Sequence, residues 1–214
     1  MIGPNSEGGK RMAAVEFWLA NVKLETGYYF ENGTVTGTET ADFHIKIEDG
    51  KIKEMMLAEK QLVTNLPIYD ANHYLMLPSF RDMHIHIDKT YYGGPWKAPS
   101  IPTKGIITRL EEERELLPRL LPVAKERAEK LLDLLLHSGS TYVRTHCNID
   151  PVIGLKNLEA TLQAVETFKG KADVEIVAFP QHGLLRSKSV SLVREALRNG
   201  ASLVGGVDPA SIDE

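Results

Sequence analysis

Two histidines separated by one apolar residue, His84 and His86, have the type and spacing of metal ligands. They follow an apolar run that ends at Pro78. In an extended strand, residues i and i+2 point to the same face, so both imidazoles can reach one point in space. Histidine is the commonest metal ligand, although an isolated His-X-His pair is more often a surface or core feature. A catalytic zinc-type site takes about three protein ligands and one open position, so the pair needs partners elsewhere.

Further polar and ionisable residues stand where later apolar runs end. In barrel enzymes the chemistry lies at the C-terminal ends of the strands, which is where such residues would be placed. We therefore expect them to surround the histidine pair. These residues are Asp88, His146, Gln181, His182 and Asp208.

The first part of the chain, residues 16–77, has the pattern of a small β-rich module. Aromatic residues at 28–30 lead into Asn32-Gly33, and alternating apolar residues at 43–47 lead into Asp49-Gly50. Asn-Gly and Asp-Gly supply the positive backbone angles that tight hairpins need, so we predict short strands joined by hairpins. Residues 1–15 are interpreted as a disordered extension or a cloning remnant, with Met12 as a natural start.

From residue 78 to residue 214 the pattern alternates between strands and helices. Helical spacing of apolar residues predicts a helix that tolerates Pro122 if this residue falls in the first turn and that ends at Gly139, and two further helices follow. Apolar runs at 142–149, 174–179 and 202–207 are typical of buried parallel strands. The helical stripes are Leu120, Ala124, Ala128 and Leu132, then Leu155, Leu158, Leu162 and Val165, then Val190 to Arg198.

Such alternation predicts a parallel α/β sheet, either doubly wound or closed into a (β/α)8 barrel. The Gly-X-Gly-X-X-Gly and Gly-X4-Gly-Lys-Ser/Thr fingerprints are absent from the sequence, so a barrel is favoured. A full barrel takes ~250 residues, so residues 78–214 amount to about four βα units, or the first half. An open half barrel exposes two strand edges and an apolar face, which favours self-association or pairing with a missing C-terminal half.

Composition excludes several functional classes. The 214 residues, 43% of them hydrophobic, can form a core, and a net charge of -4 gives no basic face for nucleic acid. No window approaches about 18 uninterrupted apolar residues, so we expect neither a signal peptide nor a membrane span. The single cysteine, Cys147, excludes an internal disulfide and is consistent with a cytoplasmic location.

The segment Pro78–Thr90, with the sequence PSFRDMHIHIDKT, resembles the first barrel strand of the amidohydrolase superfamily. More narrowly, it is similar to the branch that holds bacterial cytosine deaminase and the N-isopropylammelide amidohydrolases. Residues 143–146, 177–181 and 204–209 agree with that branch in order and spacing. The resemblance covers most of residues 16–214 and only the first half of a family member.

This resemblance implies a metal-dependent hydrolase barrel preceded by part of a small β-sandwich. It implies that His84 and His86 bind one divalent metal, zinc or iron, together with ligands expected beyond Glu214. The acid/base glutamate is also expected there. A bound metal makes hydroxide available at neutral pH to attack an amidine-like or amide carbon, so the expected substrate is a small nitrogen heterocycle.

Two residues match substrate-side positions of the branch. Gln181 matches a glutamine whose amide offers a donor and an acceptor to a ring edge, and capping of a loop is the less favoured alternative. Lys89 matches a lysine of the ammelide-type members, where cytosine deaminase has a neutral residue, so it points away from cytosine itself. A solvated surface amine is the alternative for Lys89. His146, Asp88 and Asp208 are assigned to the pocket or to the support of the metal ligands.

Other features have simpler interpretations. Cys147 follows His146 in a strand and so points to the opposite face, which predicts an inert buried thiol. The run Glu111 to Glu115 is interpreted as a solvated helix face. Tyr91 to Trp96 is either a loop over the pocket or an ordinary packed turn. The small zinc deaminases are excluded because they require a Pro-Cys-X-X-Cys segment.

Three hypotheses remain open at the level of sequence. The first is the N-terminal half of a cytosine-deaminase-like amidohydrolase, incomplete and inactive as this chain alone. The second is a non-catalytic fragment or interaction module that keeps the half-barrel fold. The third is a complete enzyme whose metal site consists of His84, His86 and His146.

Overall fold

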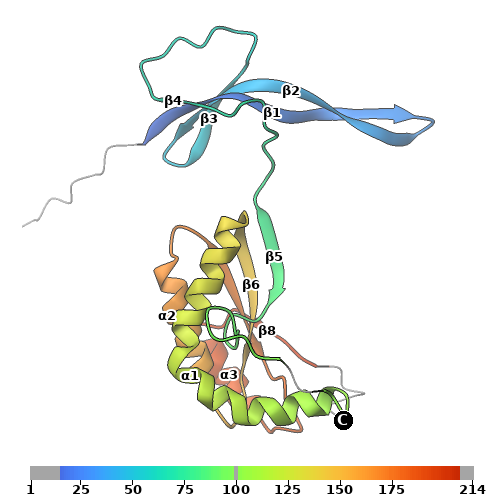
Figure 1. Cartoon of the computed structure of the whole chain (residues 1–214), viewed down its shortest axis with the longest axis vertical. Helices are drawn as coiled ribbons and strands as arrows, with labels where there is room; N and C mark the ends of the chain where they lie inside the picture. The colour runs from blue at the N-terminus through green and yellow to red at the C-terminus, as the bar shows by residue number, and fades with distance from the viewer. Residues whose placement is uncertain (1–14, 99–100, 208–214) are drawn as a thin grey trace, which may run out of the picture. The chain divides into compact units, whose positions relative to one another are not determined.

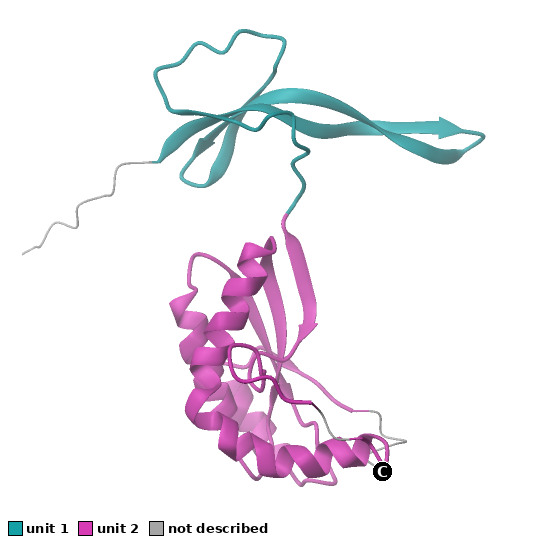
Figure 2. Cartoon of the chain, in the orientation of Figure 1, with its two compact units in different colours: residues 1–78 teal, residues 79–214 magenta. Residues whose placement is uncertain are grey.

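The computed structural model describes residues 15–98 and 101–207, and the chain divides into two units, Met1–Pro78 and Ser79–Glu214 (Figure 2). Of the extension predicted for residues 1–15, residues 1–14 lie outside the described residues. Asp208 also lies outside them. Each unit contains its own sheet (Figure 1).

The first unit is a four-stranded sheet in the order β3-β2-β1-β4. Its hairpins turn at Asn32-Gly33, with φ of 50° and 79°, and at Asp49-Gly50, with φ of 49° and 72°, which confirms both predicted turns. The first two strands are longer than the short strands predicted, because register shifts let their ladder bend without breaking. The strands are β1 (Glu16–Glu31), β2 (Thr34–Glu48), β3 (Lys51–Leu57) and β4 (Ile68–Asp70).

The second unit alternates strand and helix along its whole length, which confirms the predicted mixed α/β pattern. Its four strands are all parallel and lie in the order β5-β6-β7-β8. The elements are β5 (Phe80–Ile85), α1 (Ile106–His137), β6 (Ser140–Asn148), α2 (Lys156–Thr167), β7 (Asp173–Phe179), α3 (Val190–Arg198) and β8 (Leu203–Val204).

Two boundaries differ from the sequence prediction. Helix α1 begins at Ile106, so Pro122 lies well inside it and not in its first turn, which makes that prediction wrong. The helix continues through Pro122 because Leu120 and Ala124 on either side are buried, and packing outweighs the lost backbone hydrogen bond. Strand β8 is only two residues long, since glycines at 205 and 206 follow it at once.

Alternation along the strands separates two faces of the parallel sheet. Val143 of β6 packs with Ala128 and Leu132 of α1, while Cys147 packs with Leu158 of α2. In Figure 1 these helices cover one face of the sheet. Even-numbered residues of β6 therefore point to the opposite face.

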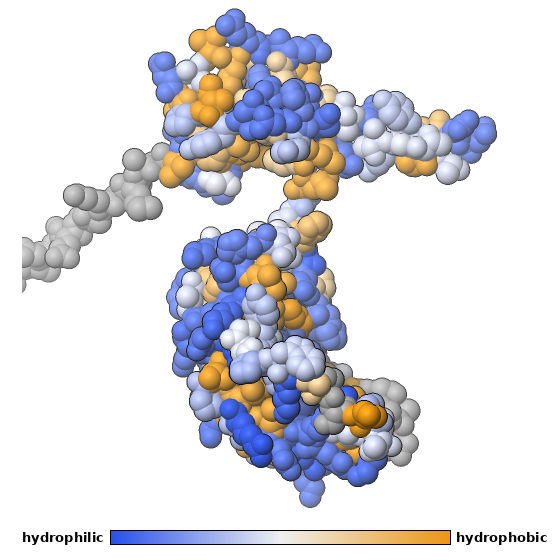
Figure 3. Space-filling view, in the orientation of Figure 1, coloured by the Kyte–Doolittle hydropathy of each residue, from blue (hydrophilic) through white to orange (hydrophobic). Residues whose placement is uncertain are grey.

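Apolar side chains also reach the surface. Phe80 and Met83 of the edge strand β5 are 64% and 41% exposed. Apolar surface is visible in both units in the view of Figure 3. None of the helices in residues 15–98 and 101–207 is long and apolar enough to cross a membrane.

Candidate functional site

Three imidazoles gather at the C-terminal end of the parallel sheet. His84 lies in β5, His86 directly follows it, and His146 lies in the neighbouring strand β6. The rings of His84 and His146 stack with centroids 4.1 Å apart, and the His86 ring lies 5.7 Å and 5.6 Å from them. The parallel pairing of Ile85 with Thr145 brings these positions side by side. All three histidines alternate along the chain with residues that pack against the helices, so they face the opposite side of the sheet.

The surroundings disfavour protonation of two of these imidazoles. Burial, followed by the positive charge of Lys89, lowers the pKa of His86 to about 4. Burial and the nearby His84 also lower the pKa of His146. The Nδ1 atoms of both rings are buried and have no hydrogen-bond partner among the described residues. A neutral imidazole with an unused nitrogen is the form in which histidine binds a metal.

The cluster fits part of a metal site and not a complete one. Within residues 15–98 and 101–207, no group of three or more His, Cys, Asp or Glu side chains is arranged to hold a metal ion. The His84 and His146 rings lie nearly parallel, with an interplanar angle of 21°. The complete site of His84, His86 and His146 considered from the sequence is therefore not formed.

Asp88 lies beside His86 and forms hydrogen bonds to two elements. Its Oδ2 accepts hydrogen bonds from the backbone N–H of Asn148 at 2.8 Å and from Nδ2 of Asn157 at 2.9 Å. Its Oδ1 lies 3.9 Å from Nδ1 of His86. Burial raises the pKa of this carboxyl group. Asp88 thus lies beside His86, while its hydrogen bonds go to β6 and α2.

The two residues predicted to face the substrate lie together and share a third partner. Lys89 Nζ donates to Gln181 Oε1 and, at 2.8 Å, to Glu113 Oε1. Gln181 Nε2 donates to the same Glu113 oxygen at 3.0 Å. The side chains of Lys89 and Glu113 are 14% and 16% exposed, so the interpretation of Lys89 as a solvated surface amine is wrong.

Glu113 was missed by the sequence interpretation, which placed the whole run Glu111 to Glu115 on a solvated face. That interpretation holds for Glu115, whose side chain is 79% exposed, and is wrong for Glu113. Positions two apart on a helix point to nearly opposite sides. Glu113 lies three residues after Leu110 and four before Leu117, both buried. Extending the apolar stripe of α1 toward its N-terminus would have placed Glu113 on the inner face of the helix.

The remaining candidates lie around this cluster. His182 is 3% exposed, with Nε2 3.9 Å from Glu113 Oε2 and Nδ1 3.8 Å from Asp150 Oδ2. Burial lowers the pKa of His182, and the two carboxylates oppose this.

Cys147 is fully buried on the helix side, and burial raises the pKa of its thiol, as expected for an inert cysteine.

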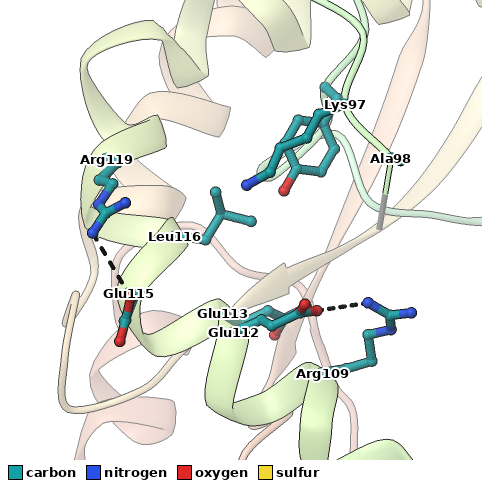
Figure 4. A pocket seen from close by; sticks show the side chains of 9 residues that line it. Lys97, Ala98, Arg109, Glu112, Glu113, Glu115, Leu116 and Arg119 are labelled. Carbon is teal, nitrogen blue, oxygen red and sulfur yellow. Dashed lines mark hydrogen bonds and ion pairs between the residues drawn. The ribbon is translucent and has the colours of Figure 1, made fainter. Parts of the chain in front are cut away.

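A cavity of about 410 Å³ adjoins Glu113. Figure 4 shows that charged side chains of α1 line it, with Arg109 paired to Glu112 at 2.6 Å and Arg119 to Glu115 at 3.7 Å. Tyr91, from the segment predicted as a loop or packed turn, also lines the cavity. Trp96 of the same segment is 88% exposed.

Comparison with known proteins gives a consistent group of relatives, although no protein-family model matches the chain. The chain is 48% identical over 212 residues to an uncharacterized protein, YahJ, of Escherichia coli (strain K12), covering 98% of this chain and 46% of that protein. It is 34% identical over 147 residues to the N-isopropylammelide isopropyl amidohydrolase of Pseudomonas sp. (strain ADP), covering 66% of this chain and 36% of that enzyme.

A solved structure agrees with the sequence relatives. The N-isopropylammelide isopropylaminohydrolase of Burkholderia multivorans superimposes with a TM-score of 0.75 and 30% identity, over 92% of this chain and 46% of that one. The chain therefore spans less than half the length of the relatives that it matches.

Proposed function

Because the chain belongs to the amidohydrolase superfamily, we propose that it contributes the first metal ligands and the substrate-facing residues of a metal-dependent hydrolase. The reaction would cleave a C–N bond of a nitrogen heterocycle. The observation that carries this proposal is the cluster of His84, His86 and His146, in which buried Nδ1 atoms remain without hydrogen bonds among the described residues.

In this proposal His84 and His86 hold one divalent metal, zinc or iron. Such a metal, when bound, lowers the pKa of a coordinated water from ~16 toward ~7 and so supplies a nucleophile at neutral pH. The low pKa of His86 keeps its imidazole neutral at that pH, with one of the two ring nitrogens unprotonated. His146 packs against both ligands and limits their rotation. In this proposal the remaining ligands and the acid/base residue come from the remaining barrel strands.

The proposed architecture is the first half of a (β/α)8 barrel, residues 78–214, with residues 16–77 as part of a small β-sandwich. The histidines support it, because in a barrel the face opposite the helices is the interior. The exposed apolar residues of β5 also support it, since an edge strand of this kind is covered in a finished barrel. The open edges of the sheet would pair with the remaining barrel strands.

The proposed substrate is an ammelide-like ring. Lys89 supplies an ammonium and Gln181 an amide within hydrogen-bond distance of one another at the edge of the cluster. These groups recognise ring nitrogens and exocyclic oxygens of a triazine or pyrimidine. The relative from Pseudomonas is named for N-isopropylammelide, which supports that ring over cytosine.

The direct test is turnover by the zinc- or iron-loaded protein that contains this chain together with the remaining barrel strands. Release of isopropylamine from N-isopropylammelide and release of ammonia from cytosine are measured. His84→Ala and His86→Ala should each lower turnover by at least about a hundredfold. His137→Ala is the matched control, because that side chain is 76% exposed at the end of α1. Turnover that survives both ligand changes contradicts the proposal. Absence of turnover in every variant, with self-association retained, favours the non-catalytic module.

A further inference from the structure

We propose that Glu113 is a positioning residue that holds Lys89 and Gln181 in the arrangement that recognises hydrogen-bond acceptors of the substrate. The inference rests on the proposed function for the role of these two residues. Glu113 thereby makes α1 one of the elements that form the site.

The first observation is that one carboxylate reaches residues that follow or end three different strands. Glu113 Oε1 accepts from Lys89 after β5 and from Gln181 after β7, at 2.8 and 3.0 Å. Glu113 Oε2 accepts from Asn148 Nδ2, at the end of β6, at 3.4 Å. A surface glutamate would not be surrounded in this way. The carboxylate therefore fixes the relative positions of three strand ends.

The second observation is that the three side chains form a closed ring of hydrogen bonds. Lys89 donates to both Glu113 and Gln181, and Gln181 donates to Glu113. The carboxylate can only accept, so it must face the NH2 group of Gln181, and the amide oxygen is turned toward the ammonium. Glu113 thus determines the orientation of an amide that could otherwise flip.

This ring of hydrogen bonds leaves N–H donors of Lys89 and Gln181 available to a ligand. Lys89 has three N–H donors, of which two are used, and the Gln181 amide nitrogen has two, of which one is used. Among the described residues no further partner takes the remaining donors. The ammonium and the carboxylate also neutralise each other. The group therefore presents mainly N–H donors, which suit an oxo group or an unprotonated ring nitrogen.

A purely structural role for Glu113 makes a different prediction. If the carboxylate only anchored α1, its loss would reduce the fraction of correctly folded protein, which lowers kcat and leaves KM unchanged. If it positions the two substrate-facing residues, its loss raises KM more than it lowers kcat. The two roles can therefore be separated by kinetics.

The first experiment measures the acylation rate of Lys89 by isotope-coded acetic anhydride and mass spectrometry, in the purified protein. Glu113→Ala should increase this rate by about tenfold, because it removes a charge-assisted hydrogen bond from a largely buried amine. Glu115→Ala, on the same helix with a side chain 79% exposed, is the matched control and should leave the rate unchanged. Glu113→Gln keeps an acceptor oxygen and the shape of the side chain, and should give an intermediate rate.

The second experiment measures kcat and KM for N-isopropylammelide in the protein that contains this chain together with the remaining barrel strands. Glu113→Ala should raise KM by about tenfold with a smaller change in kcat, and Glu113→Gln should restore part of the loss. Equal Lys89 acylation in Glu113→Ala and Glu115→Ala overturns the inference, as does a loss of kcat with KM unchanged. If the wild type turns over no heterocycle, the proposed function fails, and the acylation rates still decide whether Glu113 holds Lys89.

Discussion

The backbone N–H of Asn148 donates a hydrogen bond to Asp88 Oδ2 across 2.8 Å, and it joins the end of β6 to the segment that follows His86. The side-chain amide of Asn157 donates to the same oxygen at 2.9 Å, so α2 is tied to this point as well. Both donors and the carboxylate are almost fully buried. Through these hydrogen bonds, Asp88 supports the loop that carries Lys89.

Substitution of Asp88 should separate the role of its oxygen from the role of its charge. Asp88→Ala leaves two buried donors without partners and should lower the free energy of unfolding by about 2–5 kcal/mol. Asp88→Asn keeps one carbonyl oxygen, which can accept both hydrogen bonds because both go to Oδ2, and should cost clearly less. Urea unfolding of the three proteins measures the difference. Equal losses in the two variants would mean that the charge, and not the acceptor oxygen, is what matters.

The low pKa of His86 predicts a pH-dependent stability. In the unfolded chain the imidazole takes up a proton as the pH falls through about 6.5, whereas in the folded protein it does so only near pH 4. The unfolded state therefore binds more protons between these values, and stability falls as the pH falls through this window. The loss at pH 4 is as much as about 3 kcal/mol.

The measurement is urea unfolding between pH 7 and pH 4 with a chelator present, since a bound metal would also exclude the proton. His86→Asn should show a shallower decline than the wild type. If the two proteins lose stability in parallel, the His86 ring does not titrate at a lowered pKa.

The packing of α1 can be tested by two leucines two positions apart. Leu132 is fully buried against β6, whereas Leu134 is 41% exposed. Leu132→Ala should cost about 2–5 kcal/mol, and Leu134→Ala about 1 kcal/mol or less. Thermal or urea unfolding gives both values. A larger loss for Leu134 than for Leu132 would show that Leu134, and not Leu132, faces the sheet.

The reactivity of Cys147 tests the interior of the second unit. The thiol is fully buried, its pKa is raised by burial, and it is the only cysteine in the chain. Ellman's reagent should therefore react only as fast as the protein opens, and the rate should rise with urea. Rapid reaction in the absence of urea would contradict a buried thiol.

Much of the fold could be predicted because the local signals are strong. Tight hairpin turns require positive φ angles, which Asn-Gly and Asp-Gly adopt more readily than most dipeptides. The chain turns at both Asn32-Gly33 and Asp49-Gly50. The spacing of Leu120, Ala124, Ala128 and Leu132 gave the inner face of α1, and all four are buried. The start of that helix could not be predicted, because tertiary packing carries it through two prolines that local rules treat as breaks.

The candidate site could be predicted only in part. His84 and His86 could be predicted because they form a short-range His-X-His pattern. His146 and Gln181 could be predicted because each stands at the end of an apolar run that reads as a strand. The contact of Glu113 with Lys89 joins residues 24 positions apart through a side-chain hydrogen bond. Such a contact depends on how α1 packs against the sheet, and charge patterning alone assigned Glu113 to solvent.

The central claim is that His84 and His86 bind a divalent metal, and cobalt binding tests it most directly. Co²⁺ added to the metal-free purified protein should give visible d–d absorption bands with a saturable titration. The double variant His84→Ala/His86→Ala should lose these bands, while the control His137→Ala should retain them. Cobalt spectra and affinity that are the same in the wild type and the double variant would contradict the account.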